Sequence, residues 1–269
     1  MDIRAAVVDL DGTVLSGDEL IPGAAEALER IRESVEHVLF LTNNPTRPPE
    51  AYAEKLQDLG VLARPEEVIT SCVATIDYLD AEHAGETVFP VAEESIVSQL
   101  RDAGVPLTDD ATEADVVVAG YDREFHYHDM IAALRAFEHD GGEDVAFVGT
   151  DPDRTVPAPN GPVPGSGAII RAVAGVADRE PDAILGKPSQ ETVDLAAERL
   201  GVPAEECVLV GDRLDTDVAM GEKAGMTTIL VRTGVTDERE LAESEFTPNH
   251  VVDDLAAVPD LLDEFARNE

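Results

Sequence analysis

The stretch AAVVDLDGTVL, residues 5–15, decides how this chain is interpreted. Its apolar residues lead straight into Asp9 and Asp11, which are followed by Gly12 and Thr13. A short apolar, β-branched run predicts a buried strand, and buried strands normally avoid charge. Because alternate residues of an extended chain point to the same side, both carboxylates are expected on one side of the strand's end. The stretch therefore indicates a site where a buried strand ends.

The composition allows a soluble protein with real hydrophobic cores. At 269 residues with 43% hydrophobic residues, the chain can form one large domain or two ordinary ones. It begins directly with a strand pattern, without a signal-like segment, and has no apolar run of membrane-spanning length. Cys72 and Cys207 lie far apart, which argues against a disulfide framework or a zinc site. We therefore expect a cytoplasmic protein.

The net charge is the most unusual global feature. The chain has 57 acidic and 19 basic residues, a formal charge of −38, and this field repels nucleic acid and anionic membranes. Neither is therefore an expected partner. Acidic residues occur along nearly every predicted helix rather than in one tail, which favours adaptation to high salt and a halophilic protein. Only Lys55, Lys187 and Lys223 are lysines, so a lysine at a special position is informative.

Short apolar runs alternate with helix-period segments throughout the chain, which predicts parallel βαβ units in an α/β fold. The expected strands are 4–10, 37–41, 87–91, 115–119, 145–148, 183–185, 207–210, 227–231 and 250–252. The expected helices are 23–33, 49–59, 93–102, 129–139, 167–177, 190–200 and 217–224. The prediction is a Rossmann-like core with a helix-flanked parallel sheet.

The middle of the chain differs from its ends. Residues 83–181 contain six of the eleven aromatic residues and the Pro/Gly-rich stretch DPDRTVPAPNGPVPGSG, residues 151–167. The acidic motifs lie on both sides of this segment. We therefore expect a discontinuous core of residues 1–82 and 182–269, with an inserted α/β domain formed by residues 83–181.

Ligands of open parallel sheets bind at the carboxyl ends of the strands, so the residues after each predicted strand matter most. Four such positions carry candidate site residues, which are Asp9 and Asp11; Thr42, Asn43 and Asn44; Gly186, Lys187 and Pro188; and Gly211, Asp212, Asp215 and Asp217.

Four of these carboxylates, Asp9, Asp11, Asp212 and Asp217, would repel one another at a single sheet edge. A hard divalent cation resolves this repulsion, and Mg²⁺ with its oxygen ligands is the natural candidate. Taken singly, each residue has an ordinary explanation: Asp11 and Gly12 could form a turn, and Asp212 could cap a helix. Together, at the ends of strands of one sheet, they favour a metal site.

The hydroxyl and ammonium groups complete a candidate phosphate site. Thr42 and the backbone N–H groups after it can donate to phosphate oxygens, while Lys187 supplies a positive charge. The alternative for Lys187, a solvated surface lysine, fits poorly with its position between Gly186 and Pro188 in a lysine-poor chain. Pro181 stands where an ATP-binding loop needs its first glycine, and GSGAII, residues 165–170, lacks the third glycine of a dinucleotide site.

The motifs DLDGTV (9–14), LTNN (41–44), GKPS (186–189) and GDRLDTD (211–217) occur in the order and spacing of the haloacid dehalogenase superfamily. The chain resembles its class IIA branch of NagD-like and p-nitrophenyl phosphatases, which carries a large α/β cap. The match covers nearly the full length, including residues 150–168, which resemble the return from cap to core. Four ordered motifs make the resemblance specific, whereas DxDGT alone would only be suggestive.

The resemblance implies a phosphatase acting on small phosphate monoesters, such as sugar, glycerol or glycolate phosphates. Asp9 is then the nucleophile that forms an aspartyl-phosphate. Asp11 is the general acid that protonates the leaving oxygen and then the base that activates water. Thr42 and Asn43 bind the phosphate, and Lys187 orients Asp9 and stabilises charge.

The resemblance also implies a Mg²⁺ site. Asp9, the backbone carbonyl of Asp11 and Asp212 hold the metal, and Asp217 supports them from close by. One departure from the branch is Asp151, where asparagine is common, and this position bears on substrate preference. Residues 122–127 and 151–154 of the cap are the candidates for specificity.

Three alternatives stay open from the sequence. A phospho-accepting signalling domain also gathers acids, a threonine and a lysine around Mg²⁺, but it is about half this length and accepts phosphate on a later strand. A dehalogenase shares the aspartate nucleophile but needs no metal. A binding protein without turnover would not need every reactive position filled. A homodimer is also open, since cap-to-cap dimers are common in similar proteins.

Overall fold

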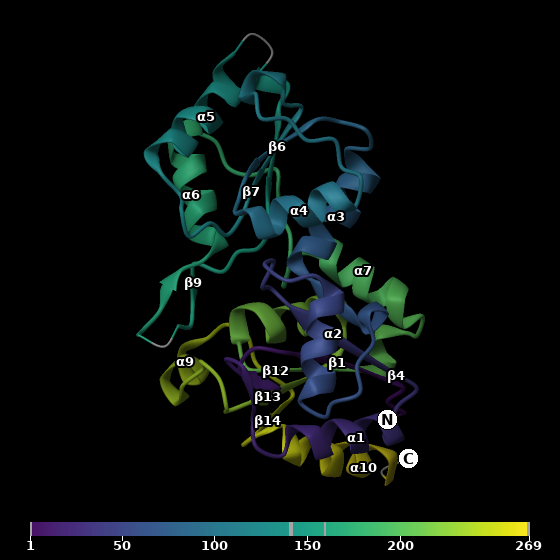
Figure 1. Ribbon diagram of the computed structural model, residues 1–269. Helices are drawn as coiled ribbons and strands as arrows, with labels where there is room; N and C mark the ends of the chain where they lie inside the picture. Colours follow the sequence, from purple (N-terminus) through teal and green to yellow (C-terminus); the bar gives the residue numbers. More distant parts are fainter. Residues whose placement is uncertain (1, 140–141, 159, 268–269) are drawn as a thin grey trace. The chain divides into compact units, whose positions relative to one another are not determined.

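The computed structural model describes residues 2–139, 142–158 and 160–267 (Figure 1). The chain forms two compact units. The first contains the residues up to Thr42, Pro49–Ile69, and the residues from Lys187 onward. The second contains Asn43–Pro48 and Thr70–Gly186. The predicted inserted domain, residues 83–181, lies within the second unit, and its boundaries stay a prediction.

The first unit is built on a six-stranded sheet with the order β14-β13-β12-β1-β4-β5. In chain order these strands are β1 (Ala5–Asp9), β4 (His37–Thr42), β5 (Val68–Thr70), β12 (Cys207–Gly211), β13 (Thr227–Val231) and β14 (His250–Val252). β1 lies inside the sheet and pairs in parallel with both β12 and β4. The short strands β2 (Leu15–Ser16) and β3 (Glu19–Leu20) form an antiparallel pair directly after β1.

Apolar residues on one face of this sheet form the main core. Val8 of β1 and Phe40 of β4 belong to the same buried cluster as Ile31 and Leu262. The helices of this unit are α1 (Ala24–Ser34), α2 (Pro49–Asp58), α7 (Gln190–Leu200), α8 (Ala219–Ala224), α9 (Glu238–Glu243) and α10 (Val258–Arg267). α1 buries residues at helical spacing and packs against α10 (Figure 1). The burial of β1 explains why its apolar residues precede the two aspartates.

The second unit has a four-stranded parallel sheet with the order β11-β8-β7-β6. Its strands are β6 (Val88–Val91), β7 (Val116–Ala119), β8 (Ala146–Gly149) and β11 (Ala183–Ile184). Its helices are α3 (Ser71–Glu82), α4 (Glu94–Asp102), α5 (Tyr127–Glu138) and α6 (Ser166–Ala177). α5 packs against α6, and Phe147 is buried in the core of this unit. The Pro/Gly-rich stretch contains the antiparallel pair β9 (Thr155–Val156) and β10 (Val163–Pro164).

Both sheets are parallel and carry helices, so the expected α/β class is confirmed. One placement differs from the expectation: β11, predicted as residues 183–185 of the core sheet, pairs with β8 in the second sheet. An apolar run this short carries no information about which sheet it joins. Lys187 therefore does not follow a strand of the first sheet. Instead it lies at the return of the chain to the first unit, just before Ser189 caps α7.

Some elements of the structure were not expected from the sequence. β5, α3, α9 and α10 have no counterpart among the expected strands and helices. The helix expected from residue 217 begins at Ala219, because a wider helical turn, Leu214–Val218, precedes it. Within the described part of the chain, none of the helices has the length and apolar character to span a membrane.

Candidate active site

Three candidate residues lie where neighbouring strands of the first sheet end. Asp9 is the last residue of β1, Thr42 is the last residue of β4, and Asp212 directly follows β12. Because β1 pairs in parallel with both of the other strands, their carboxyl ends meet at the same edge of the sheet. The sheet therefore brings together positions that are up to about 200 residues apart in sequence.

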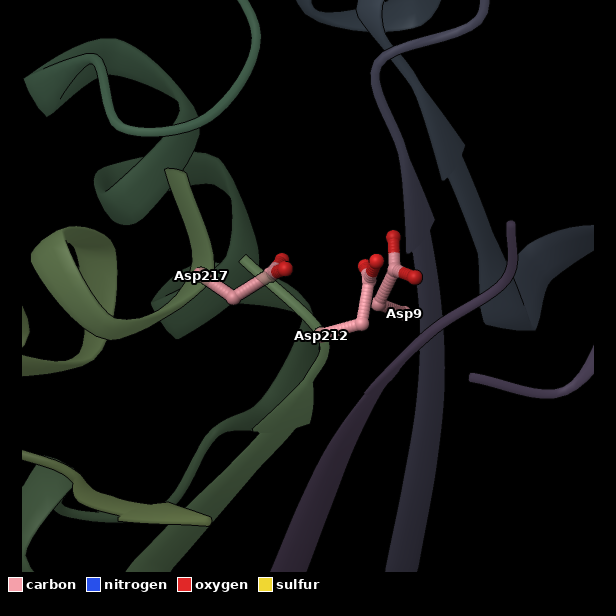
Figure 2. A group of neighbouring side chains, drawn as sticks. All are labelled: Asp9, Asp212 and Asp217. Atoms are coloured by element: carbon pink, nitrogen blue, oxygen red, sulfur yellow. The ribbon is translucent and has the colours of Figure 1, made fainter. Parts of the chain in front are cut away.

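Three buried carboxylates gather at this edge. One carboxylate oxygen from each of Asp9, Asp212 and Asp217 lies within 4.8 Å of the others. Figure 2 shows the side chains of Asp9 and Asp212 next to each other, with the carboxyl group of Asp217 directed toward them. Asp217 comes from the helical turn after β12, so a short stretch of chain supplies two of the three acids.

Lys187 is buried among these acids. Its Nζ donates to Asp9 Oδ1, and it donates to Asp217 Oδ1 over 2.6 Å. The second oxygen of Asp217 accepts the backbone N–H of Arg213 over 3.1 Å. Both Asp217 oxygens therefore have donors from the protein, and this residue is placed to orient Lys187.

Burial dominates the electrostatics of the cluster. Burial raises the pKa of Asp9 well above its ordinary value, although the Lys187 ammonium opposes the shift. Burial and the neighbouring Asp217 raise the pKa of Asp212 to about 7, against the opposing hydrogen bond from the backbone of Val235. For Lys187, burial lowers the pKa but Asp217 and Asp9 raise it by more, so this side chain stays an ammonium. The Lys187 ammonium thus contacts two of the three buried acids, Asp9 and Asp217.

The residues fit a hard divalent cation. Asp9 Oδ2 is buried and has no hydrogen-bond partner within the part of the chain that the structure describes. A buried carboxylate oxygen without a donor costs free energy unless a cation or ligand meets it. Asp9 and Asp212 could hold such a cation, since carboxylate oxygens are the ligands that Mg²⁺ prefers.

Asp11 has a different environment from Asp9. Its side chain is exposed, and its Oδ2 accepts a hydrogen bond from Thr42 Oγ1 over 3.2 Å. The Asp11 carboxylate is not part of the three-acid cluster found among the described residues. The two acids thus differ: Asp9, at the end of β1, is buried beside Lys187, whereas Asp11, just after β1, is exposed and accepts a hydrogen bond from Thr42.

Asn43 and Asp151 belong to the second unit. The Asn43 carbonyl accepts a hydrogen bond from Ser71 Oγ over 2.7 Å. Asp151 is buried and accepts hydrogen bonds from Thr150 Oγ1 and the backbone N–H of Asp153, each over 3.1 Å. The predicted phosphate-binding role of Asn43 and the specificity role of residues 122–127 and 151–154 stay predictions.

Comparison with known proteins places the chain in a family. A family of haloacid dehalogenase-like hydrolases matches residues 6–106, and a second family of this type matches residues 184–258. An acid sugar phosphatase of Staphylococcus epidermidis is 34% identical over 252 residues, which cover 94% of this chain and 95% of that protein. The chain belongs to the haloacid dehalogenase superfamily.

Comparison with other members of the superfamily identifies the branch to which this chain belongs. A dihydroxyacetone phosphatase of Corynebacterium glutamicum is 32% identical over 258 residues, covering 96% of this chain and 91% of that protein. The structure of a p-nitrophenyl phosphatase from Archaeoglobus fulgidus aligns with a TM-score of 0.89 and 32% identity, covering 97% of this chain and 100% of that one. The chain is therefore a class IIA, NagD-like phosphatase of this superfamily. Among the alternatives open from the sequence, the phosphatase is the one supported.

Two contacts at this haloacid dehalogenase site were not expected from the sequence. After β13, the backbone N–H of Val235 donates to Asp212 Oδ2 over 2.8 Å, and Thr233 Oγ1 donates to the carbonyl of Gly12 over 2.6 Å. The available signal was a Thr-Gly pair just past a predicted strand, the same kind of position that singled out Thr42.

Proposed function

We propose that this chain is a Mg²⁺-dependent phosphatase that hydrolyses small phosphate monoesters through an aspartyl-phosphate on Asp9. The observation that carries the proposal is the environment of Asp9. One of its oxygens accepts from Lys187, and the other is buried without a donor among the described residues. That second oxygen is available to a metal or to phosphorus.

The ammonium of Lys187 supports Asp9 as a nucleophile. It holds the carboxylate in one orientation and, together with a bound Mg²⁺, offsets the negative charge of the approaching phosphate. When bound, the metal supplies positive charge beside the phosphoryl oxygens. Burial of Asp9, Lys187 and Asp217 excludes water from their contacts, which strengthens these interactions.

The first half of the reaction transfers the phosphoryl group to the protein. An oxygen of Asp9 forms a bond to phosphorus while the bond from phosphorus to the leaving oxygen breaks. Asp11 donates a proton to that oxygen, so the alcohol leaves neutral. The exposed position of Asp11 and its hydrogen bond from Thr42 suit a group that meets the substrate and exchanges protons with it.

The second half regenerates the protein. Asp11 takes a proton from water as the water oxygen bonds to phosphorus, and the bond between phosphorus and the Asp9 oxygen breaks. Inorganic phosphate and free Asp9 result. The two acids can divide these tasks because their environments differ in burial and in hydrogen-bond partners.

The substrate class is proposed from the relatives. Proteins 32–34% identical to this chain over nearly their whole lengths are an acid sugar phosphatase and a dihydroxyacetone phosphatase. We expect phosphate esters of small sugars, glycerol or glycolate to be the substrates. A phosphate-release screen over such esters in molar KCl identifies the preferred one.

The chemistry is tested with p-nitrophenyl phosphate. We expect phosphate release that EDTA abolishes and Mg²⁺ restores, and a phosphoprotein that can be trapped by acid quench and released by hydroxylamine. Asp9→Asn should give neither turnover nor phosphoprotein. Asp18→Asn, a change at an exposed aspartate near the β2–β3 pair, serves as the matched control and should keep both. Turnover by the Asp9→Asn protein at the parent rate would contradict the proposal.

A further inference from the structure

The loop that follows β13 contacts two strand ends of the first unit at once. From this loop, the Val235 N–H reaches the carboxylate of Asp212 after β12, and the Thr233 hydroxyl reaches the carbonyl of Gly12 after β1. Neither contact is local in sequence, since Gly12 lies 221 residues from Thr233. The loop therefore connects the two segments that carry Asp9 and Asp212.

The Asp212 carboxylate lies against two glycines. A Cβ on Gly234 would overlap the Asp212 side chain, and a Cβ on Gly12 would lie 2.6 Å from Asp212 Oδ2. Real Cβ atoms do not approach other atoms so closely, so both positions need glycine beside this carboxylate. Gly12 also has a φ of 99°, which favours glycine by itself. Gly234 is different, because there only the space beside Asp212 opposes a side chain.

Both ends of the loop are anchored. On one side, the Arg232 N–H donates to the carbonyl of Val252 over 3.2 Å, which continues the contact between β13 and β14. On the other side, Asp237 caps α9, accepting the Glu240 N–H over 2.7 Å, while the Glu240 carboxylate accepts the Asp237 N–H over 3.1 Å. A short loop held at both ends is preorganised, so its two contacts with the site have a defined geometry.

We propose that residues 233–235 are positioning residues of the metal site, which hold the Asp212 carboxylate and the Gly12 carbonyl in a fixed relation. This inference rests on the proposed metal-dependent function. The three residues act through Asp212 and through the carbonyl of Gly12, the residue after Asp11, without themselves touching the substrate. Groups that orient metal ligands typically contribute about 10–100-fold to metal affinity.

The hydroxyl of Thr233 is tested by metal binding to the full chain. We expect Thr233→Val to raise the Mn²⁺ dissociation constant by about 10-fold or more. Electron paramagnetic resonance of free Mn²⁺ measures this binding. Thr233→Ser keeps the hydroxyl and should bind like the parent. Thr236→Val, the same change three residues along the loop, is the matched control and should also bind like the parent.

Kinetics separates positioning from a general structural effect. For Thr233→Val, the Mg²⁺ concentration that gives half-maximal phosphatase activity should rise by the same factor as the Mn²⁺ dissociation constant. At saturating Mg²⁺, kcat should return to within about 3-fold of the parent, since the reacting groups are unchanged. A loss of kcat that saturating metal does not recover would overturn the proposal.

The close approach of Gly234 is tested by adding one methyl group. Gly234→Ala should weaken Mn²⁺ binding more than Thr233→Val does, because the new Cβ must displace Asp212 or the loop. Gly175→Ala is the matched control: this glycine lies in α6 of the second unit, and a Cβ there meets only open space. Circular dichroism without metal establishes whether each variant is folded. If Gly234→Ala does not fold, the Mn²⁺ affinity of Thr233→Val alone tests the positioning role.

The outcomes separate this inference from the proposed function. If the parent binds Mn²⁺ but Thr233→Val and any folded Gly234→Ala bind it within 2-fold of the parent, only the positioning role is overturned. If the parent binds no Mn²⁺ and its phosphatase activity resists EDTA, the proposed metal dependence fails, and the positioning role falls with it.

Discussion

Lys187 Nζ donates a hydrogen bond to Asp217 Oδ1 across 2.6 Å, with both side chains buried. The same ammonium also contacts Asp9, so it is shared between two acids that lie far apart in the sequence. Removing one partner of such a buried arrangement leaves uncompensated charge, which is more costly than losing a surface ion pair. We therefore expect Lys187 to contribute to the stability of the fold, apart from its proposed role in the chemistry.

We expect Lys187→Met to lower the free energy of unfolding by about 3–5 kcal/mol, because Asp9 and Asp217 then lose the buried ammonium that they share. Urea unfolding in EDTA measures this loss. Lys223→Met is the matched control, since the exposed Lys223 donates to the carbonyl of Pro188 over 2.7 Å, and its loss should cost less than about 1 kcal/mol. Equal stabilities of the two variants would show that the buried contact is not stabilising.

The exposed Asp11 should be separable from folding. Asp11→Asn should leave the free energy of unfolding within about 0.5 kcal/mol of the parent, since its side chain is at the surface. It should lower kcat about 10²–10⁴-fold, because proton transfer is lost.

The choice of substrate sharpens this prediction for Asp11→Asn. The p-nitrophenolate ion leaves without needing a proton, whereas a sugar alcohol needs one. A first-turnover burst with p-nitrophenyl phosphate should therefore survive better than phosphoryl transfer from a sugar phosphate. Equal losses in this first transfer step for both substrates would exclude Asp11 as the general acid.

Asp151 should make stability depend on pH. Burial, with the nearby Asp153, raises the pKa of Asp151 to about 7 in the folded protein, above its ordinary value of 3.8. Between these two values the folded state keeps a proton that the unfolded chain has lost, so stability falls as the pH rises through this range. The Asp151 carboxyl therefore destabilises the protein most above about pH 7, and not below the unfolded pKa.

Asp151→Asn tests this directly, because an amide mimics the neutral acid. The stability of the variant relative to the parent should increase between pH 5 and pH 8 by an amount on the order of 3 kcal/mol. Urea unfolding of both proteins at the two pH values measures it. A difference that does not change with pH would mean that Asp151 has the same charge in the folded and unfolded chains over this range.

The charge of −38 predicts that salt stabilises the fold. Repulsion between like charges is screened as the Debye length falls from about 10 Å at 0.1 M salt to about 3 Å at 1 M. The thermal midpoint should therefore rise steeply with KCl. Sucrose stabilises by exclusion without screening charge, so it should give a much smaller rise. Equal effects of KCl and sucrose would argue against charge repulsion as the cause.

Much of this site follows from local patterns. The apolar run before Asp9 is buried as β1, as expected. The residues that follow the apolar runs at 37–41 and 207–210 lie at one edge of the sheet, also as expected. Strand periodicity is a local property, and parallel pairing brings strand ends together whatever the loops do. Residues such as Asp9, Thr42 and Asp212 could therefore be selected without coordinates.

Other features depend on partners that are far away in the sequence. Local pattern does not say that β11 joins the second sheet, that the exposed Asp11 and buried Asp9 differ, or that both oxygens of Asp217 accept hydrogen bonds. Nor does it indicate that Val235 reaches Asp212.

The sequence by itself determined the α/β class, the strand that leads into the two acids, and the kinds of side chain at the site. Only the tertiary structure decided how those side chains are paired and how deeply they are buried. The physical reason is range: the alternation of apolar residues acts over a few neighbouring positions, whereas the desolvation and hydrogen bonding of Asp9, Lys187 and Asp212 depend on segments brought together by folding.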